Sequence, residues 1–109
     1  MMADFEAVPA AQVPEGAAVL DVREAYEFEV GHAPGAVHIP VDDIPSRFEE
    51  LDPDEDYHVI CRTGGRSVQI AGWLTAQGYS ALFVSGGYDA WITAGKPLVS
   101  ITGEEPRIL

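Results

Sequence analysis

The stretch YHVICRTGGRSVQIAGWLTAQG (57–78) has the pattern of a strand, a glycine turn and a helix. Its start, 57–61, is a short apolar run that brings Cys61 to the end of a predicted strand. Its last part, 66–78, carries an apolar stripe at helical spacing and ends at Gly78, where a left-handed residue commonly closes a helix. This order predicts one strand–helix unit of a parallel sheet.

The sequence on either side repeats this alternation of apolar runs and amphipathic stretches. Further strands are expected around Phe5–Val8 and at 17–22, 35–40 and 81–84, and further helices at 23–31, 42–51 and 88–95. Apolar runs without polar alternation are typical of strands that are covered on both faces. The prediction is an α/β fold with a mostly parallel five-stranded sheet flanked by helices. A chain of 109 residues suits one domain over 1–109, with a core at about 5–99 and a loose tail at 100–109.

Composition narrows the range of partners. A net charge of −12 and a pI near 4.3 argue against binding to nucleic acid or to an anionic membrane, since both are polyanions. The start lacks the pattern of a signal peptide, and no apolar run approaches the ~20 residues that span a bilayer. With one cysteine the chain forms no internal disulfide and offers no cysteine pair to a metal. We expect a cytoplasmic protein without a bound metal.

The loop CRTGGRS (61–67) holds the only cysteine and two of the six basic residues. Ligands bind at the carboxyl ends of parallel strands, and Gly64 and Gly65 allow a sharp turn with N–H groups pointing inward. The helix that follows adds its own free N–H groups and the positive end of its dipole. This environment favours a thiolate, so we expect Cys61 to be a nucleophile without a His–Asp dyad. The alternative, a small buried apolar cysteine, explains neither the glycines nor the arginines.

Four segments follow one another in an informative order: LDVREAYEFEVGHAPGAVHIP (20–40), VICRTGGRS (59–67), AGWLTAQGY (71–79) and FVSGGYDAWITAGKPL (83–98). Together, over about residues 18–98, they resemble the single-domain rhodanese-like sulfurtransferases. The first resembles the family's Asp-x-Arg and Gly-His-x-Pro-Gly-Ala stretch, and the second its active-site loop. The third is similar to the helix after that loop, and the last to the closing Gly-Gly-x-x-x-Trp segment.

The resemblance implies a mechanism. A sulfane sulfur donor, either thiosulfate or a persulfide, gives its outer sulfur to Cys61, and a thiol or cyanide acceptor then removes it. Arg62 and Arg66 would bind the small anionic donor and stabilise the leaving sulfite. The cradle would consist of the backbone N–H groups of Thr63, Gly64, Gly65, Arg66 and Ser67. No metal or organic cofactor is implied, and a sulfur-accepting protein is a further candidate partner.

Two alternatives stay open. Cys-based phosphatases and arsenate reductases have a spacing from cysteine to arginine that is one residue longer than the spacing from Cys61 to Arg66, so that the arginine would fall at Ser67. The shorter loop makes a smaller cradle, which suits one sulfur atom better than a phosphate. The second alternative is a sulfur-carrier or regulatory module that binds partners and turns over slowly or not at all.

Asp21 and Arg23 follow a predicted buried strand, where a lone charge would be costly. We expect a supporting role, in a polar network that ties this strand end to the Cys61 loop, rather than a direct role at the rim of the site. Gly86–Gly87 is expected to shape the pocket at the same edge of the sheet. No catalytic role is expected for His32, His38 or His58.

Overall fold

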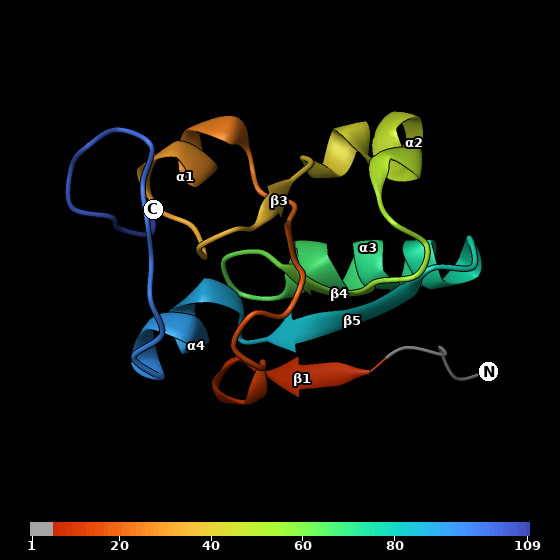
Figure 1. The fold of residues 1–109 in the computed structure, drawn as a ribbon, viewed down its shortest axis with the longest axis horizontal. Coiled ribbons are helices and arrows are strands. Elements are labelled where there is room, and N and C mark those ends of the chain that lie inside the picture. The colour runs from red at the N-terminus through yellow and green to blue at the C-terminus, as the bar shows by residue number, and fades with distance from the viewer. Residues whose placement is uncertain (1–5) are drawn as a thin grey trace.

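The computed structural model describes residues 6–109, and a five-stranded sheet runs through its centre (Figure 1). All pairings within this sheet are parallel, and the spatial order is β1-β5-β4-β2-β3. The strands are β1 (Ala7–Pro9), β2 (Val19–Asp21), β3 (Val37–His38), β4 (Asp56–Ile60) and β5 (Ser80–Ser85). The predicted α/β class and five-stranded sheet are confirmed. Phe5, the expected start of the edge strand, lies outside the described residues.

Short and long helices accompany the sheet. The α-helices are α1 (Ala25–Val30), α2 (Ile44–Arg47), α3 (Gly65–Ala76) and α4 (Gly87–Thr93). The 3-10 turns are η1 (Ala10–Gln12), η2 (Val41–Asp43) and η3 (Phe48–Glu50). The prediction of one helix over 42–51 is wrong, because the structure has three short helical turns there. The backbone leaves the helical range at Arg47 (φ −126°, ψ −2°), which separates α2 from η3, and the 3-10 turn η2 precedes α2.

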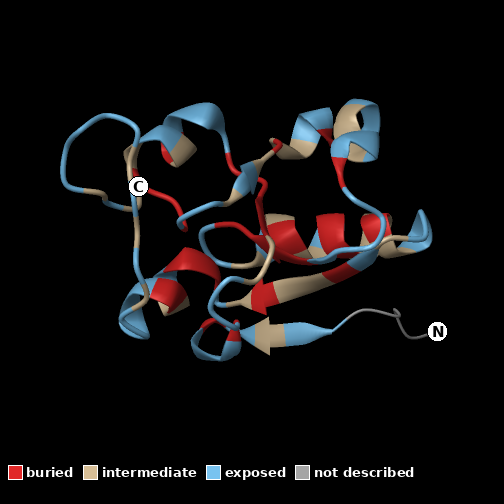
Figure 2. Cartoon of the chain, viewed as in Figure 1, coloured by how far each residue is buried: buried red, intermediate tan, exposed pale blue. Residues whose placement is uncertain are grey.

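Buried side chains form one cluster on each face of the sheet, because successive residues of a strand point to opposite faces. The first cluster joins the strands to α2 and α3 and includes Leu20, Val59, Ile44 and Leu74. The second joins the strands to η1 and α4 and includes Ala10, Ile60, Val84, Tyr88 and Trp91. Figure 2 shows this burial along the central strands and on α3 and α4. The sheet is therefore covered on both faces, as the continuous apolar runs predicted.

One edge of the sheet gathers the residues that the sequence singled out. Parallel strands present their carboxyl ends on the same side. Asp21 ends β2, Cys61 follows β4, and Ser85 ends β5. Helices α1, α3 and α4 each begin a few residues after one of these strand ends. The fold thus brings three loops from distant parts of the sequence to one place.

The segment after α4 returns alongside α1 (Figure 1). Val99 pairs with His32 in an antiparallel bridge, and the Ile101 and Arg107 N–H groups donate to the carbonyl oxygens of Glu29 and Val30. The looseness expected for 100–109 stays a prediction about solution behaviour. Across residues 6–109, no helix is long and apolar enough to cross a membrane.

Candidate active site

The Cys61 side chain lies inside a turn of backbone N–H groups. Its Sγ accepts hydrogen bonds from the Gly64 N–H at 3.1 Å and from the Ser67 N–H at 3.4 Å. Gly64 makes this turn with φ +123°, and Gly65 then begins α3, whose first turn points its free N–H groups toward the loop. Two N–H groups of the predicted cradle therefore contact the sulfur. Those of Thr63, Gly65 and Arg66 make no hydrogen bond to it.

The Ser67 hydroxyl completes the contacts of the sulfur. The thiol hydrogen of Cys61 can be donated to Ser67 Oγ at 3.5 Å, and Ser67 Oγ donates in turn to the Gly64 carbonyl oxygen at 3.0 Å. Only 1% of the Cys61 residue is exposed. Once the thiol proton is lost, two N–H dipoles remain aimed at the sulfur in a site with little water. The arrangement can therefore hold negative charge on sulfur.

Helix α4 fixes the position of this loop. The Tyr88 N–H donates to the Cys61 carbonyl oxygen at 2.9 Å, and the Asp89 N–H donates to that of Arg62 at 3.1 Å. The approach is close enough that a Cβ on Gly87 would overlap both carbonyl groups. The first turn of α4 thus holds the backbone of the loop, while the missing side chain of Gly87 leaves space for that backbone.

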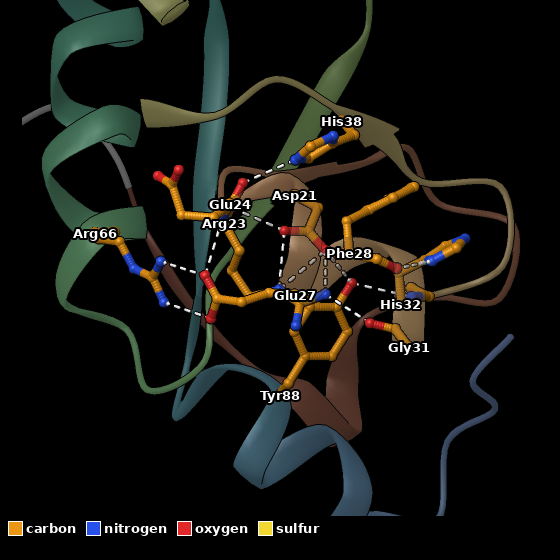
Figure 3. A network of polar contacts seen from close by, with 11 residues as sticks. Asp21, Arg23, Glu24, Glu27, Phe28, Gly31, His32, His38, Arg66 and Tyr88 are labelled. Atoms are coloured by element: carbon orange, nitrogen blue, oxygen red, sulfur yellow. Dashed lines mark hydrogen bonds and ion pairs between the residues drawn. The ribbon is translucent and has the colours of Figure 1, made fainter. Parts of the chain in front are cut away.

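Both arginines of the loop are paired with carboxylates. Arg66, in the first turn of α3, donates from Nη1 and Nη2 to Glu27 Oε1 and Oε2 at 2.8 and 3.2 Å (Figure 3). Arg62 lies farther out, with its Nε 3.5 Å from Asp89 Oδ1, and about half of its side chain is exposed. Neither guanidinium of the loop therefore stands without an acidic partner.

The pairing of Arg66 with Glu27 stabilises both charges. The hydrogen bond to Glu27 raises the pKa of Arg66, and the nearby Cys61 and Asp21 charges act in the same direction. Burial alone would raise the pKa of Glu27, but hydrogen bonds from Arg66 and from the Glu24 backbone lower it below its ordinary value. Both groups are therefore ionised at neutral pH.

Asp21 and Arg23 belong to a buried network of polar contacts that includes Gly31 and Tyr88 (Figure 3). Both are 0% exposed, and Arg23 donates to Asp21 from Nε and Nη2, the latter at 2.7 Å. Arg23 Nη2 also donates to the Gly31 carbonyl oxygen, and the Arg23 guanidinium stacks 4.3 Å from the ring centre of Tyr88. The Tyr88 hydroxyl donates to Asp21 at 2.9 Å and accepts from the Ala33 N–H at 3.0 Å.

The contacts of Asp21 and Arg23 reach the Cys61 loop indirectly. Neither Asp21 nor Arg23 forms a hydrogen bond with the Cys61 side chain. They reach the loop through Tyr88, whose own N–H holds the Cys61 carbonyl oxygen. Burial, and then the charge of Asp21, raise the pKa of Tyr88 strongly, so its hydroxyl stays protonated and can donate.

Sequence reasoning missed Glu27 and Tyr88. A signal for Glu27 was present, since Glu24 and Glu27 have the spacing of a capping box and the Glu24 N–H does donate to Glu27 at 3.0 Å. That spacing explains the start of α1, but it does not reveal the pairing with Arg66. For Tyr88 no local signal existed beyond its place after two glycines.

The three histidines are used elsewhere. His32 bonds to the Phe28 carbonyl oxygen, His38 to that of Arg23, and His58 to that of Ala18. Beside the Cys61 loop lies an open groove of about 650 Å³ with mostly small side chains on its walls. Its walls include Pro9, Ala10, Thr63, Gly86, Asp89 and Ala90.

Both the sequence and the fold of the chain are similar to those of known proteins. The family model of the Rhodanese-like domain matches residues 7–94. A sulfurtransferase of Allochromatium vinosum is 37% identical over 90 residues, which cover 82% of this chain and 84% of that protein. A thiosulfate sulfurtransferase of Pseudomonas syringae is 34% identical over 97 residues, covering 84% of this chain and 92% of that protein. The crystal structure of a rhodanese-related protein from Thermoplasma volcanium superposes with a TM-score of 0.83 at 33% identity, covering 87% of this chain and 98% of that one.

Proposed function

The chain belongs to the rhodanese-like domain family, and we propose that it transfers sulfane sulfur through a persulfide on Cys61. The donor is thiosulfate or a persulfide, and the acceptor is a thiol, with cyanide as its laboratory substitute. The observation that carries this proposal is the pair of N–H groups, from Gly64 and Ser67, that converge on Cys61 Sγ. Relatives that match most of their own length are named sulfurtransferases.

In the first half of the reaction, the Cys61 thiolate attacks the outer sulfur of the donor. The new S–S bond forms as the old one breaks, and the leaving group takes the electron pair, as sulfite from thiosulfate or as a thiolate from a persulfide. The Gly64 and Ser67 N–H groups stabilise the negative charge on sulfur through this exchange. Because Cys61 is 1% exposed, the donor reaches it with the terminal sulfur only.

In the second half, the acceptor attacks the outer sulfur of the Cys61 persulfide. The bond between the two sulfurs breaks, and Cys61 leaves as the thiolate that began the cycle. One transfer is thereby divided into two displacements at sulfur. The stabilised Cys61 thiolate is the nucleophile in the first and the leaving group in the second.

We propose the following roles for the residues of the site. Cys61 is the catalytic residue, and Asp21 and Arg23 support the loop from below. Substrate binding is assigned to Arg62, Thr63, Gly64, Gly65, Arg66 and Ser67. We also propose that residues 1–109 act as one domain with its core at about 5–99, and that it works in the cytoplasm, where reducing conditions keep Cys61 free.

A sulfur-carrier role is the second candidate. A buried Cys61, held by two N–H groups, would protect a persulfide from solvent between loading and delivery. The groove beside the loop would then receive the protein that takes the sulfur. The chemistry at Cys61 is the same in both roles, and the difference lies in the rate of release.

Intact-protein mass spectrometry after treatment with thiosulfate or with an organic persulfide tests the proposal. We expect the gain of one sulfur atom, its removal by cyanide, and no gain in Cys61→Ser. Repeated turnover with a small thiol supports the enzyme, whereas loading without turnover supports the carrier. Hydrolysis of an aryl phosphate without any sulfur gain would show that the proposed chemistry is wrong.

A further inference from the structure

The arginines around the Cys61 loop are matched one to one by carboxylates. The pairs are Arg66 with Glu27, Arg62 with Asp89, and Arg23 with Asp21. The positive charge expected to attract an anionic donor is therefore offset within the site itself. A thiolate on Cys61 adds one more negative charge, and the chain as a whole carries −12.

The Arg66–Glu27 pair is the decisive one, because it is bidentate and partly buried. Both terminal nitrogens of Arg66 are engaged, at 2.8 and 3.2 Å, and only 8% of the Glu27 side chain is exposed. A donor that used the Arg66 fork would have to displace a carboxylate that is held at both oxygens. That displacement would leave Glu27 as an unpaired buried charge, which is costly.

Resting on the proposed function, we infer that Glu27 sets the donor specificity, so that the site prefers an organic persulfide to thiosulfate. Thiosulfate brings two negative charges and leaves as a doubly charged sulfite. An organic persulfide brings at most one and leaves as a singly charged thiolate. Where the cations of a site are already neutralised, they offset little of the free energy that desolvating a dianion costs. The acidic surface also repels a dianion more strongly than a monoanion.

The preferred first step is balanced without any further reagent. The Cys61 thiolate attacks the terminal sulfur of R–S–SH and forms a new S–S bond. The bond between that sulfur and R–S breaks, its electron pair leaves with R–S⁻, and the proton stays on the transferred sulfur. The products are Cys61–S–SH and a thiolate, so no oxidant or reductant is consumed.

The test compares the rates at which thiosulfate and 2-hydroxyethyl persulfide, whose organic part is uncharged, load sulfur onto Cys61. The wild type should load faster from the persulfide. Glu27→Gln keeps an oxygen for the Arg66 and Glu24 N–H groups but removes the charge, so Arg66 acts on the donor as a free cation. We expect thiosulfate loading to rise about tenfold in this variant and persulfide loading to change little.

Matched variants separate specificity from general effects. Glu29→Gln makes the same charge change on an exposed position of α1 and should leave the ratio of the two loading rates unchanged. Adding Arg66→Gln to Glu27→Gln should cancel the gain with thiosulfate. Asp89→Asn frees Arg62 in an exposed pair, so it should raise thiosulfate loading in the same direction by less, even if Glu27→Gln folds poorly.

Three results would overturn the inference. They are equal loading by both donors in the wild type, an equal change for both donors in Glu27→Gln, and no gain with thiosulfate in folded Glu27→Gln or Asp89→Asn. If neither donor loads the wild type, the sulfurtransferase proposal itself fails and this inference fails with it. The loading ratio distinguishes these cases, because a variant that merely weakens the fold slows both donors together.

Discussion

Two glycine pairs lie at the same edge of the sheet, and their surroundings differ. Gly64–Gly65 follows β4 and Gly86–Gly87 follows β5, and each pair leads into a helix. A Cβ added to Gly65 would meet nothing within 4 Å, whereas one added to Gly87 would overlap the carbonyl group of Cys61. Gly65 thus faces open space at the start of α3, whereas Gly87 leaves space for the loop that holds the sulfur.

The N–H groups of the two helices show the same division. In the first turn of α4, the Tyr88 and Asp89 N–H groups are used on carbonyl oxygens of the neighbouring loop. At the start of α3, the Ser67 N–H points instead at Cys61 Sγ. Similar glycine turns therefore make different contacts, and only the packing around each turn tells which one holds the neighbouring loop and which one surrounds the sulfur.

Gly87→Ala is expected to have the largest effect at this edge of the sheet. Gly87 has φ +56°, and the new Cβ would lie 2.6 Å from the Arg62 carbonyl carbon. Left-handed backbone strain and overpacking together predict a loss of roughly 2–5 kcal/mol in the free energy of unfolding. Urea unfolding would measure that loss, and sulfur loading of Cys61 should fall because the loop is displaced.

Gly16→Ala is the matched control for this variant. Gly16 has a similar positive φ of +81°, but an added Cβ there meets nothing within 4 Å. It should therefore show backbone strain alone, about 1–2 kcal/mol, with unchanged loading. Equal losses in the two variants would mean that the contact between α4 and the loop contributes nothing.

The local parts of this edge were predictable from the sequence. The strand that delivers Cys61, the glycine turn and the helix after it depend on neighbours a few residues apart, and they appear in the structure as β4, Gly64 and α3. The segment 42–51 shows the limit of that reasoning. Its apolar spacing fits a helix, but the backbone at Arg47 interrupts it.

The pairs that cross the edge were not predictable. Glu27 and Arg66 are 39 residues apart, and Tyr88 lies 67 residues from Asp21. Among 18 acidic residues, nothing in the sequence distinguishes Glu27 as the one that folding brings to the arginine. A partner that the fold brings from a distant part of the sequence has no local sequence pattern. The burial of Asp21 and Arg23, by contrast, could be anticipated from the apolar strand in which they lie or which they follow.

Tyr88→Phe tests the buried network that joins α4 to Asp21 and Ala33. The ring stays over Arg23, but the Ala33 N–H loses its acceptor and Asp21 loses one of its donors. Leaving buried polar groups unsatisfied predicts a loss of about 1–3 kcal/mol, measurable by urea unfolding. Tyr26→Phe removes a hydroxyl from a residue that is 63% exposed, and it should have almost no effect. Comparable losses in both variants would contradict a supporting network.

Glu27→Gln tests the Arg66–Glu27 pair through the pH dependence of the free energy of unfolding. The pKa of Glu27 lies below 4.5, since hydrogen bonds from Arg66 and the Glu24 backbone outweigh the effect of burial. A lowered pKa stabilises the fold above pH 4.5, and this stabilisation is lost as the pH falls through the lower value. The variant should be less stable than the wild type by about 1 kcal/mol at neutral pH, and the gap should narrow in acid. Urea unfolding across this range checks the trend, and a gap that widens in acid would contradict it.

The smallest expected effect on stability is that of Gly65→Ala. Gly65 has no positive φ, it begins α3, and its added Cβ meets no atom within 4 Å, so we expect a change within about 0.5 kcal/mol. Because we assign Gly65 to substrate binding, its added methyl group should slow sulfur loading, and more for a bulky organic persulfide than for a small one. Unfolding in urea and mass-spectrometric loading measure the two effects on one variant. Unchanged loading for both persulfides would show that the donor approaches Cys61 from another side, and the open glycine pair would then serve the turn alone.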